Sequence, residues 1–122
     1  MSSVVMMPVH IRYNPRVIEK KRLRDLSRSI RDEVAITLRS EVPNLHREWL
    51  VVMFDRVRPG DSSGFDFIVE IDTGLPPDRA PAMKSMIAQL ERVLTLLFRD
   101  ESVNFCLWLK FAPMLCTFGE DD

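Results

Sequence analysis

Apolar residues along this chain follow two spacings. One is alternation, or a short continuous apolar run, which is typical of a strand with a buried face, and the other is a repeat of three to four residues, which is typical of an amphipathic helix. These spacings succeed one another as strand, helix, strand and then again as strand, helix, strand. The predicted strands are residues 4–13, 48–57, 65–72 and 103–111. The pattern therefore predicts two β-α-β units, separated by the Pro-Gly loop at residues 58–64.

Both predicted helices carry start signals. Asn14 followed by Pro15 fits an N-cap with proline at the first helical position, and this helix should end before Pro43. Asp78 is the corresponding N-cap of the second helix, where Pro81 fits only the first turn. Each helix has one apolar stripe, made of Leu23, Leu26, Ile30, Val34 and Leu38 in the first and Met83, Ile87, Leu90, Leu94 and Leu97 in the second.

This order of elements predicts an α+β fold of two layers, with a four-stranded sheet and two helices on one face. Two strand orders are compatible with the pattern. One is the ferredoxin-like split β-α-β sandwich, and in the other the two strands of each unit are parallel neighbours around a pseudo-twofold axis. Pro8 within the first strand indicates either an edge strand or a strand that begins near it.

The length of 122 residues, with 46% of them hydrophobic, fits one domain with one core. We divide it into a leader (1–7), a first β-α-β unit (8–58), a second unit (64–112) and a tail (113–122), which has a short further segment at 114–118. A formal charge of -1 excludes a globally basic nucleic-acid binder.

Cysteine and hydropathy patterns narrow the class of protein further. Cys106 and Cys116 are too few for a disulfide framework, and a zinc site would also need the distant His10 and His46. We therefore expect reduced thiols, no metal and no cofactor. Neither a signal sequence nor an uncharged apolar run of about 18 residues is present, which predicts a cytoplasmic protein without a membrane partner.

The stretch from Met7 to Tyr13, MPVHIRY, resembles the start of tautomerase-superfamily proteins, which begin Met-Pro followed by a short apolar strand. The region from Leu26 to Arg39, the connection at residues 43–45 and the strand LVVMF are also similar to the helix, connection and second strand of that family. Members such as macrophage migration inhibitory factor have two β-α-β units per chain. The resemblance implies the parallel-neighbour arrangement and a homotrimer in which strand edges pair across subunits.

In that family the proline becomes the first residue after methionine removal, and its secondary amine acts as a base that moves a proton between carbon and oxygen. Only Pro8 matches it here, and only if Pro8 is the mature N-terminus, because otherwise its nitrogen is an amide. Family members also bind substrate carboxylates through arginine forks. The candidates for that role are Arg12, Arg16, Arg56 and Arg58, each of which also fits a solvated strand end.

The resemblance leaves two functions open, and the sequence does not decide whether the protein is an enzyme. The first is an isomerase or tautomerase acting on a small enolisable carboxylic acid with Pro8 as base. The second is a non-catalytic oligomeric module that retains the fold and binds an anion through the basic segment at residues 16–31. That segment has no aromatic residue to stack bases, so we interpret it as a solvated helix face and expect no nucleic-acid partner.

Two further polar groups have structural interpretations. Asp66, Glu70 and Asp72 alternate with apolar residues, as expected for any half-exposed strand. His10 is a candidate proton carrier beside Pro8, but the sequence identifies no partner for it.

Overall fold

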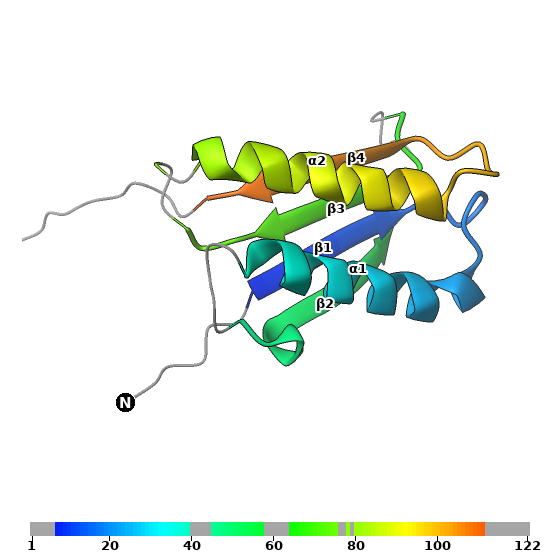
Figure 1. The fold of residues 1–122 in the computed structure, drawn as a ribbon. Coiled ribbons are helices and arrows are strands. Elements are labelled where there is room, and N and C mark those ends of the chain that lie inside the picture. The colour runs from blue at the N-terminus through cyan, green and yellow to red at the C-terminus, as the bar shows by residue number, and fades with distance from the viewer. Residues whose placement is uncertain (1–6, 40–44, 58–63, 76–77, 79, 112–122) are drawn as a thin grey trace, which may run out of the picture.

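The computed structural model describes residues 7–39, 45–57, 64–75, 78 and 80–111, and it contains the predicted succession of strands and helices. Its elements, in chain order, are β1 (Met7–Tyr13), the 3-10 helix η1 (Lys20–Arg22), α1 (Leu23–Leu38), the 3-10 helix η2 (Arg47–Trp49), β2 (Leu50–Arg56), β3 (Phe67–Asp72), α2 (Ala80–Leu97) and β4 (Phe105–Lys110). Figure 1 shows two layers, with both long helices on one face of the sheet, which confirms the predicted α+β architecture. The expected segment at 114–118 lies outside the described residues.

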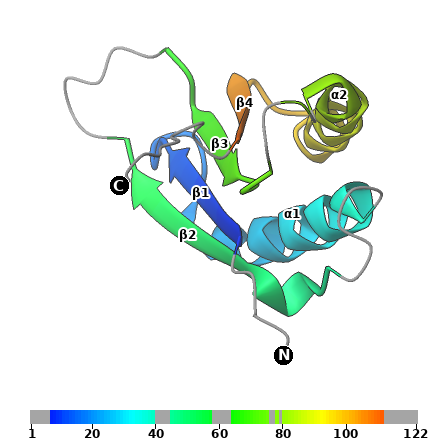
Figure 2. The same ribbon diagram turned by 90° about the vertical axis from the view of Figure 1, so that its left-hand side faces the viewer.

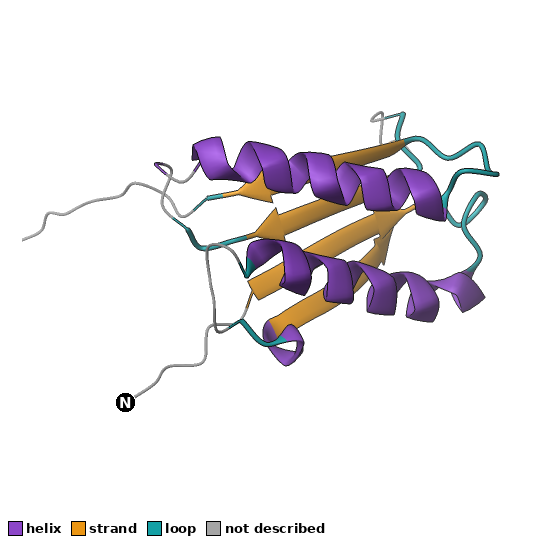
Figure 3. Cartoon of the chain, in the orientation of Figure 1, coloured by secondary structure: helices purple, strands orange, loops and turns teal. Residues whose placement is uncertain are grey.

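The order of the strands distinguishes the two predicted arrangements. The sheet runs β2-β1-β3-β4, with parallel β1/β2 and β3/β4 pairs and an antiparallel β1/β3 pair in the centre (Figure 3). In a split β-α-β unit another strand separates the two strands of one unit, whereas here they are direct neighbours. Figure 2 shows α1 beside the β1/β2 half and α2 beside the β3/β4 half. The ferredoxin-like alternative is therefore wrong.

Pro8 lies in a central strand, so its interpretation as an edge residue is wrong, while its interpretation as a strand start is confirmed. Pro8 is the register partner of Val51 on β2, but the ladder between β1 and β3 begins only at Val9. In a central strand each backbone N–H donates to one of the two neighbouring strands, and a proline has no N–H to donate. Its place before the β1/β3 ladder is the physical reason that the sheet tolerates it.

The first long helix starts later than the sequence predicts. Asn14 does not cap it: its side-chain oxygen accepts from the Arg16 N–H at 3.0 Å, and its side-chain nitrogen donates to Asp66 at 3.2 Å. Ile18 then enters the core with 0% exposure, and Glu19 is in an extended conformation that interrupts any helix begun at Pro15. Burial of Ile18 therefore delays α1 until Leu23.

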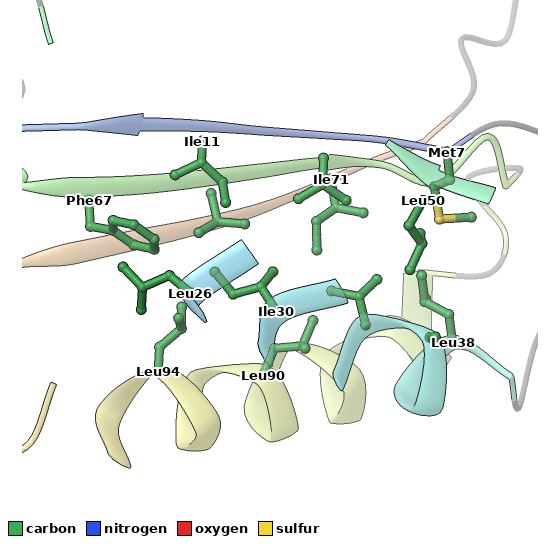
Figure 4. Packing of buried hydrophobic residues seen from close by; sticks show 14 of the residues in the cluster. Met7, Ile11, Leu26, Ile30, Leu38, Leu50, Phe67, Ile71, Leu90 and Leu94 are labelled. Carbon is green, nitrogen blue, oxygen red and sulfur yellow. The ribbon is translucent and has the colours of Figure 1, made fainter. Parts of the chain in front are cut away.

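The core lies between the helices and the helix-facing side of the sheet. Alternate residues of β1 and β3 meet the apolar stripes of α1 and α2, and Figure 4 shows these side chains pointing toward one another. Phe67 and Phe98 close one end with an edge contact between rings 5.1 Å apart. The buried helix residues are Leu26, Ile30, Val34, Ala35 and Leu38 from α1 and Met83, Met86, Leu90 and Leu94 from α2.

Candidate functional site

The side of the sheet away from the helices carries most of the polar strand residues. Because side chains alternate across a strand, the register of the four strands assigns a second set of residues to this side. We call it the helix-free face. It consists of Pro8, His10, Arg12, Val51, Met53, Asp55, Ile68, Glu70, Asp72, Cys106, Trp108 and Lys110.

Glu70 lies among the basic side chains of the helix-free face. Its side chain is only 12% exposed and accepts from Nη2 of Arg12 at 3.1 Å. Nδ1 of His10 lies 3.9 Å and Nζ of Lys110 lies 3.8 Å from its other oxygen. A carboxylate this buried needs such partners to offset its loss of hydration. The ion pairs consequently connect β1, β3 and β4 through one acidic side chain.

His10 has the partner that the sequence does not reveal. Its Nε2 lies 2.6 Å from Oδ2 of Asp55 on the neighbouring strand β2, and its ring therefore stands between two carboxylates, those of Asp55 and Glu70. An imidazole held by a carboxylate is a chemically sound proton carrier.

Pro8 follows Met7 within β1. Its nitrogen is joined to the carbonyl of Met7, which is the first residue of β1 and pairs with Leu50. The sequence-based division places Met7 in the leader, yet its side chain is 1% exposed and belongs to the core. An amide nitrogen has no lone pair available to take a proton, so Pro8 can act as a base only in a chain that begins at Pro8.

The predicted arginine set is spread along the molecule. Arg12 shares the helix-free face with Pro8, but four residues of strand, about 13 Å, separate them, and its guanidinium is already paired with Glu70. Arg16 is exposed in the turn after β1, and exposed Arg56 lies across from Tyr13 at the far end of β1 from Pro8. Arg58 lies outside the described residues. Within one chain, Arg12, Arg16 and Arg56 do not converge on Pro8.

A second polar site lies on the outer side of α1. It is an open hollow of about 300 Å³, and we call it the basic depression. Its lining is polar or charged throughout, with Arg24, Ser27, Arg28, Arg31 and Asp32 from α1 and Arg47 from η2. Arg47 is held there by Asp32, since its Nη1 donates to Oδ1 at 2.9 Å. The arginines of α1 belong to the basic segment at residues 16–31.

Comparison with known proteins identifies the fold. No protein-family model and no curated protein matches the sequence. A crystal structure of 5-carboxymethyl-2-hydroxymuconate delta-isomerase is similar with a TM-score of 0.58 and 14% identity, over 95% of this chain and 90% of that one. A fused 4-OT, described as an asymmetric trimer, has a TM-score of 0.59 and 12% identity over 85% of each chain. Leishmania major MIF2 has a TM-score of 0.53 and 13% identity, over 95% of this chain and 96% of that one.

This chain has the tautomerase fold. Identities of 12–14% establish the fold and leave the activity open. The resemblance of residues 7–13 and of the two β-α-β units to the tautomerase superfamily thus agrees with the architecture of the chain. The two parallel pairs joined antiparallel in the centre are the topology expected from it.

Other kinds of site have little support on this version of the tautomerase fold. A void between the helices and the sheet measures about 10 Å³, which holds at most one water molecule. The described residues contain no cluster of three or more metal-ligating side chains. Cys106 is a half-buried free thiol, and Cys116 lies outside the described residues. Among the described helices, none combines the length and apolarity that a membrane span requires.

Sequence reasoning missed three participants of these sites. Asp55 and Lys110 join the charged side chains around Glu70 through contacts with His10 and Glu70. Arg47 joins the basic depression from η2, the element that follows α1. The alternation of β3 indicated that Glu70 faces away from the core, but no local pattern gives the partner of a side chain on another strand.

Proposed function

We propose that this protein is a self-associating module with the tautomerase fold that does not use proline as a catalytic base. The observation that carries this proposal is the buried side chain of Met7, immediately before Pro8 in β1. Truncation of a buried methionine costs about 2–5 kcal/mol of stability. Processing that exposes the Pro8 amine would therefore also remove a core side chain.

The placement of the arginines supports the same conclusion. A carboxylate substrate beside Pro8 would need a guanidinium within reach, but Arg12 is engaged by Glu70 and Arg56 lies at the far end of the strand. A site assembled within one chain would therefore lack the arginine clamp that a tautomerase acting on a carboxylic acid requires.

Self-association is supported by the sheet. Among the described residues, no strand pairs with the outer edge of β2 or β4, and apolar Met53 and Trp108 on the helix-free face are 44% and 53% exposed. Open edges and exposed apolar side chains favour pairing with further copies of the chain. One similar structure, the fused 4-OT, is described as a trimer. We therefore assign a homotrimer with strand edges paired across subunits.

The similarity in fold to 5-carboxymethyl-2-hydroxymuconate delta-isomerase favours a second candidate function. In it, the mature chain begins at Pro8, whose amine moves a proton on a small enolisable carboxylic acid. Arg12, Arg16, Arg56 and Arg58 are then the candidates for holding the carboxylate, with some of them supplied by a neighbouring subunit.

Amino-terminal sequencing and intact mass, followed by an enol-ketone assay with phenylpyruvate, separate the two candidates. We expect the mature chain to retain Met7 and to convert phenylpyruvate no faster than buffer does, because the Pro8 nitrogen is an amide. The Pro8→Ala variant should give the same rate. A chain that begins at Pro8 and loses its conversion in Pro8→Ala would instead establish the tautomerase.

A further inference from the structure

The basic depression has an excess of positive charge that its own acidic residue does not balance. Four arginines line it against Asp32, which leaves three formal positive charges among the lining residues. Exposed Glu48, outside the lining, has Oε2 3.8 Å from Nε of Arg47. Among the described residues, Asp32 pairs with Arg47. In the described part of the chain, no carboxylate lies within 4.0 Å of the guanidinium nitrogens of Arg24, Arg28 or Arg31, and Nε of Arg31 is buried without an acceptor. The guanidinium groups therefore have hydrogen-bonding capacity that the protein leaves unused.

The arrangement of these arginines suits more than one anionic group. Arg24, Arg28 and Arg31 follow one another at intervals of four and three residues and so share one side of α1, over a length of about 10 Å. Arg47 is added from η2 and is oriented by its bond to Asp32. Because a guanidinium fork pairs with two oxygens of one anion, the set can serve two anionic groups at once.

We propose that the basic depression binds a small ligand that carries two phosphate groups. Each phosphate group brings a charge of about −1.5 to −2 near neutral pH, so two of them match the surplus, whereas a dicarboxylate brings less charge and fewer acceptor oxygens. The hollow of about 300 Å³ is at the lower limit of small-ligand pockets. Every residue that lines it is polar or charged and none is aromatic, which argues against a ligand recognised by a large apolar body or by base stacking.

Calorimetric titration of the full chain with pyrophosphate tests this site, with inorganic phosphate and succinate as comparison ligands at the same ionic strength. Pyrophosphate should bind most tightly. Arg28→Ala, at an exposed position of α1, should weaken pyrophosphate binding about ten- to hundredfold, the usual effect of losing a charged hydrogen-bond pair. Arg28→Lys should recover only part of the affinity, because the charge remains but the fork is lost.

Arg92→Ala is the matched control, since Arg92 is an exposed arginine of α2 outside the depression. It should leave pyrophosphate affinity unchanged, and circular dichroism should show that both variants are folded. Arg24→Ala, on the same side of α1 as Arg28, provides a second, independent test and should also weaken pyrophosphate binding. Equal weakening by Arg92→Ala and Arg28→Ala, equal affinity for succinate and pyrophosphate, or tighter binding of a short single-stranded oligonucleotide than of pyrophosphate would each overturn the proposal.

Discussion

Met7 and Met53 have the same side chain, yet they lie on opposite sides of the sheet. Met7 packs in the core with 1% exposure, whereas Met53 is 44% exposed on the helix-free face. The immediate neighbour of Met7 is Pro8, so the burial of one residue bears directly on the chemistry of the next. A residue that holds the fold together is poorly suited to removal as an initiating methionine.

We expect Met7→Ala to lower the free energy of unfolding by about 2–5 kcal/mol, because it leaves a cavity in the core. Met53→Ala, the matched control, should change it by about 0.5 kcal/mol or less. Urea denaturation of both variants measures the difference. Equal and small changes would show that Met7 is dispensable to the fold and would withdraw the main support for the proposed function.

At the scale of elements, the segment between β1 and α1 shows how a buried residue overrides a capping signal. Asn14 and Pro15 form an accepted helix start, and the chain makes one turn there, with the N–H groups of Val17 and Ile18 donating to the Asn14 carbonyl. Ile18 then packs into the core, and α1 begins only at Leu23. Asn14 instead links this turn to the start of β3 through Asp66.

Asn14→Ala should therefore destabilise the protein by about 1 kcal/mol, through the loss of these side-chain hydrogen bonds, while its helix content stays unchanged. Thermal unfolding measures the first effect, and circular dichroism at 222 nm below the transition measures the second. A fall in helix content in the folded protein would mean that Asn14 caps α1 after all.

At the scale of the whole molecule, the two faces of the sheet are unequally covered. The helices bury one side of the sheet, and the helix-free face combines a charged centre around Glu70 with exposed Trp108 on the outer strand β4. If this side and the strand edges are covered by further copies of the chain, exposed apolar residues on it should matter for assembly more than equally exposed ones on the helices.

Native mass spectrometry tests this difference with two substitutions of similar chemistry. The original chain and Leu96→Arg, which changes an exposed residue of α2, should have the mass of three chains. Trp108→Arg should shift the mass toward one chain, because it places a charge in the proposed contact. A monomeric original chain, or a three-chain mass for Trp108→Arg, would contradict the assigned assembly.

Much of the fold followed from local pattern. The four predicted strands and both predicted helices exist, because alternation and the three-to-four-residue repeat arise from the geometry of each element alone. The strands lie within a few residues of their expected bounds, whereas α1 begins at Leu23 and not at Pro15. The predictions were wrong where contacts with distant residues override a local signal, as at the predicted N-cap Asn14. They were also wrong where the result depends on which strands lie beside an element, as for the predicted edge position of Pro8. The charged clusters were the least predictable part, since the Glu70 and His10 contacts join residues on different strands.

The sequence by itself determined the succession of two β-α-β units, the two-layer class and the side chains available for chemistry, because each depends on composition and local periodicity. Only the tertiary structure decided that each unit keeps its strands as parallel neighbours, that Met7 seals the core ahead of Pro8, and that Arg47 completes a basic hollow with the arginines of α1. Those three features depend on contacts between residues of different elements, which the packing of the whole domain fixes.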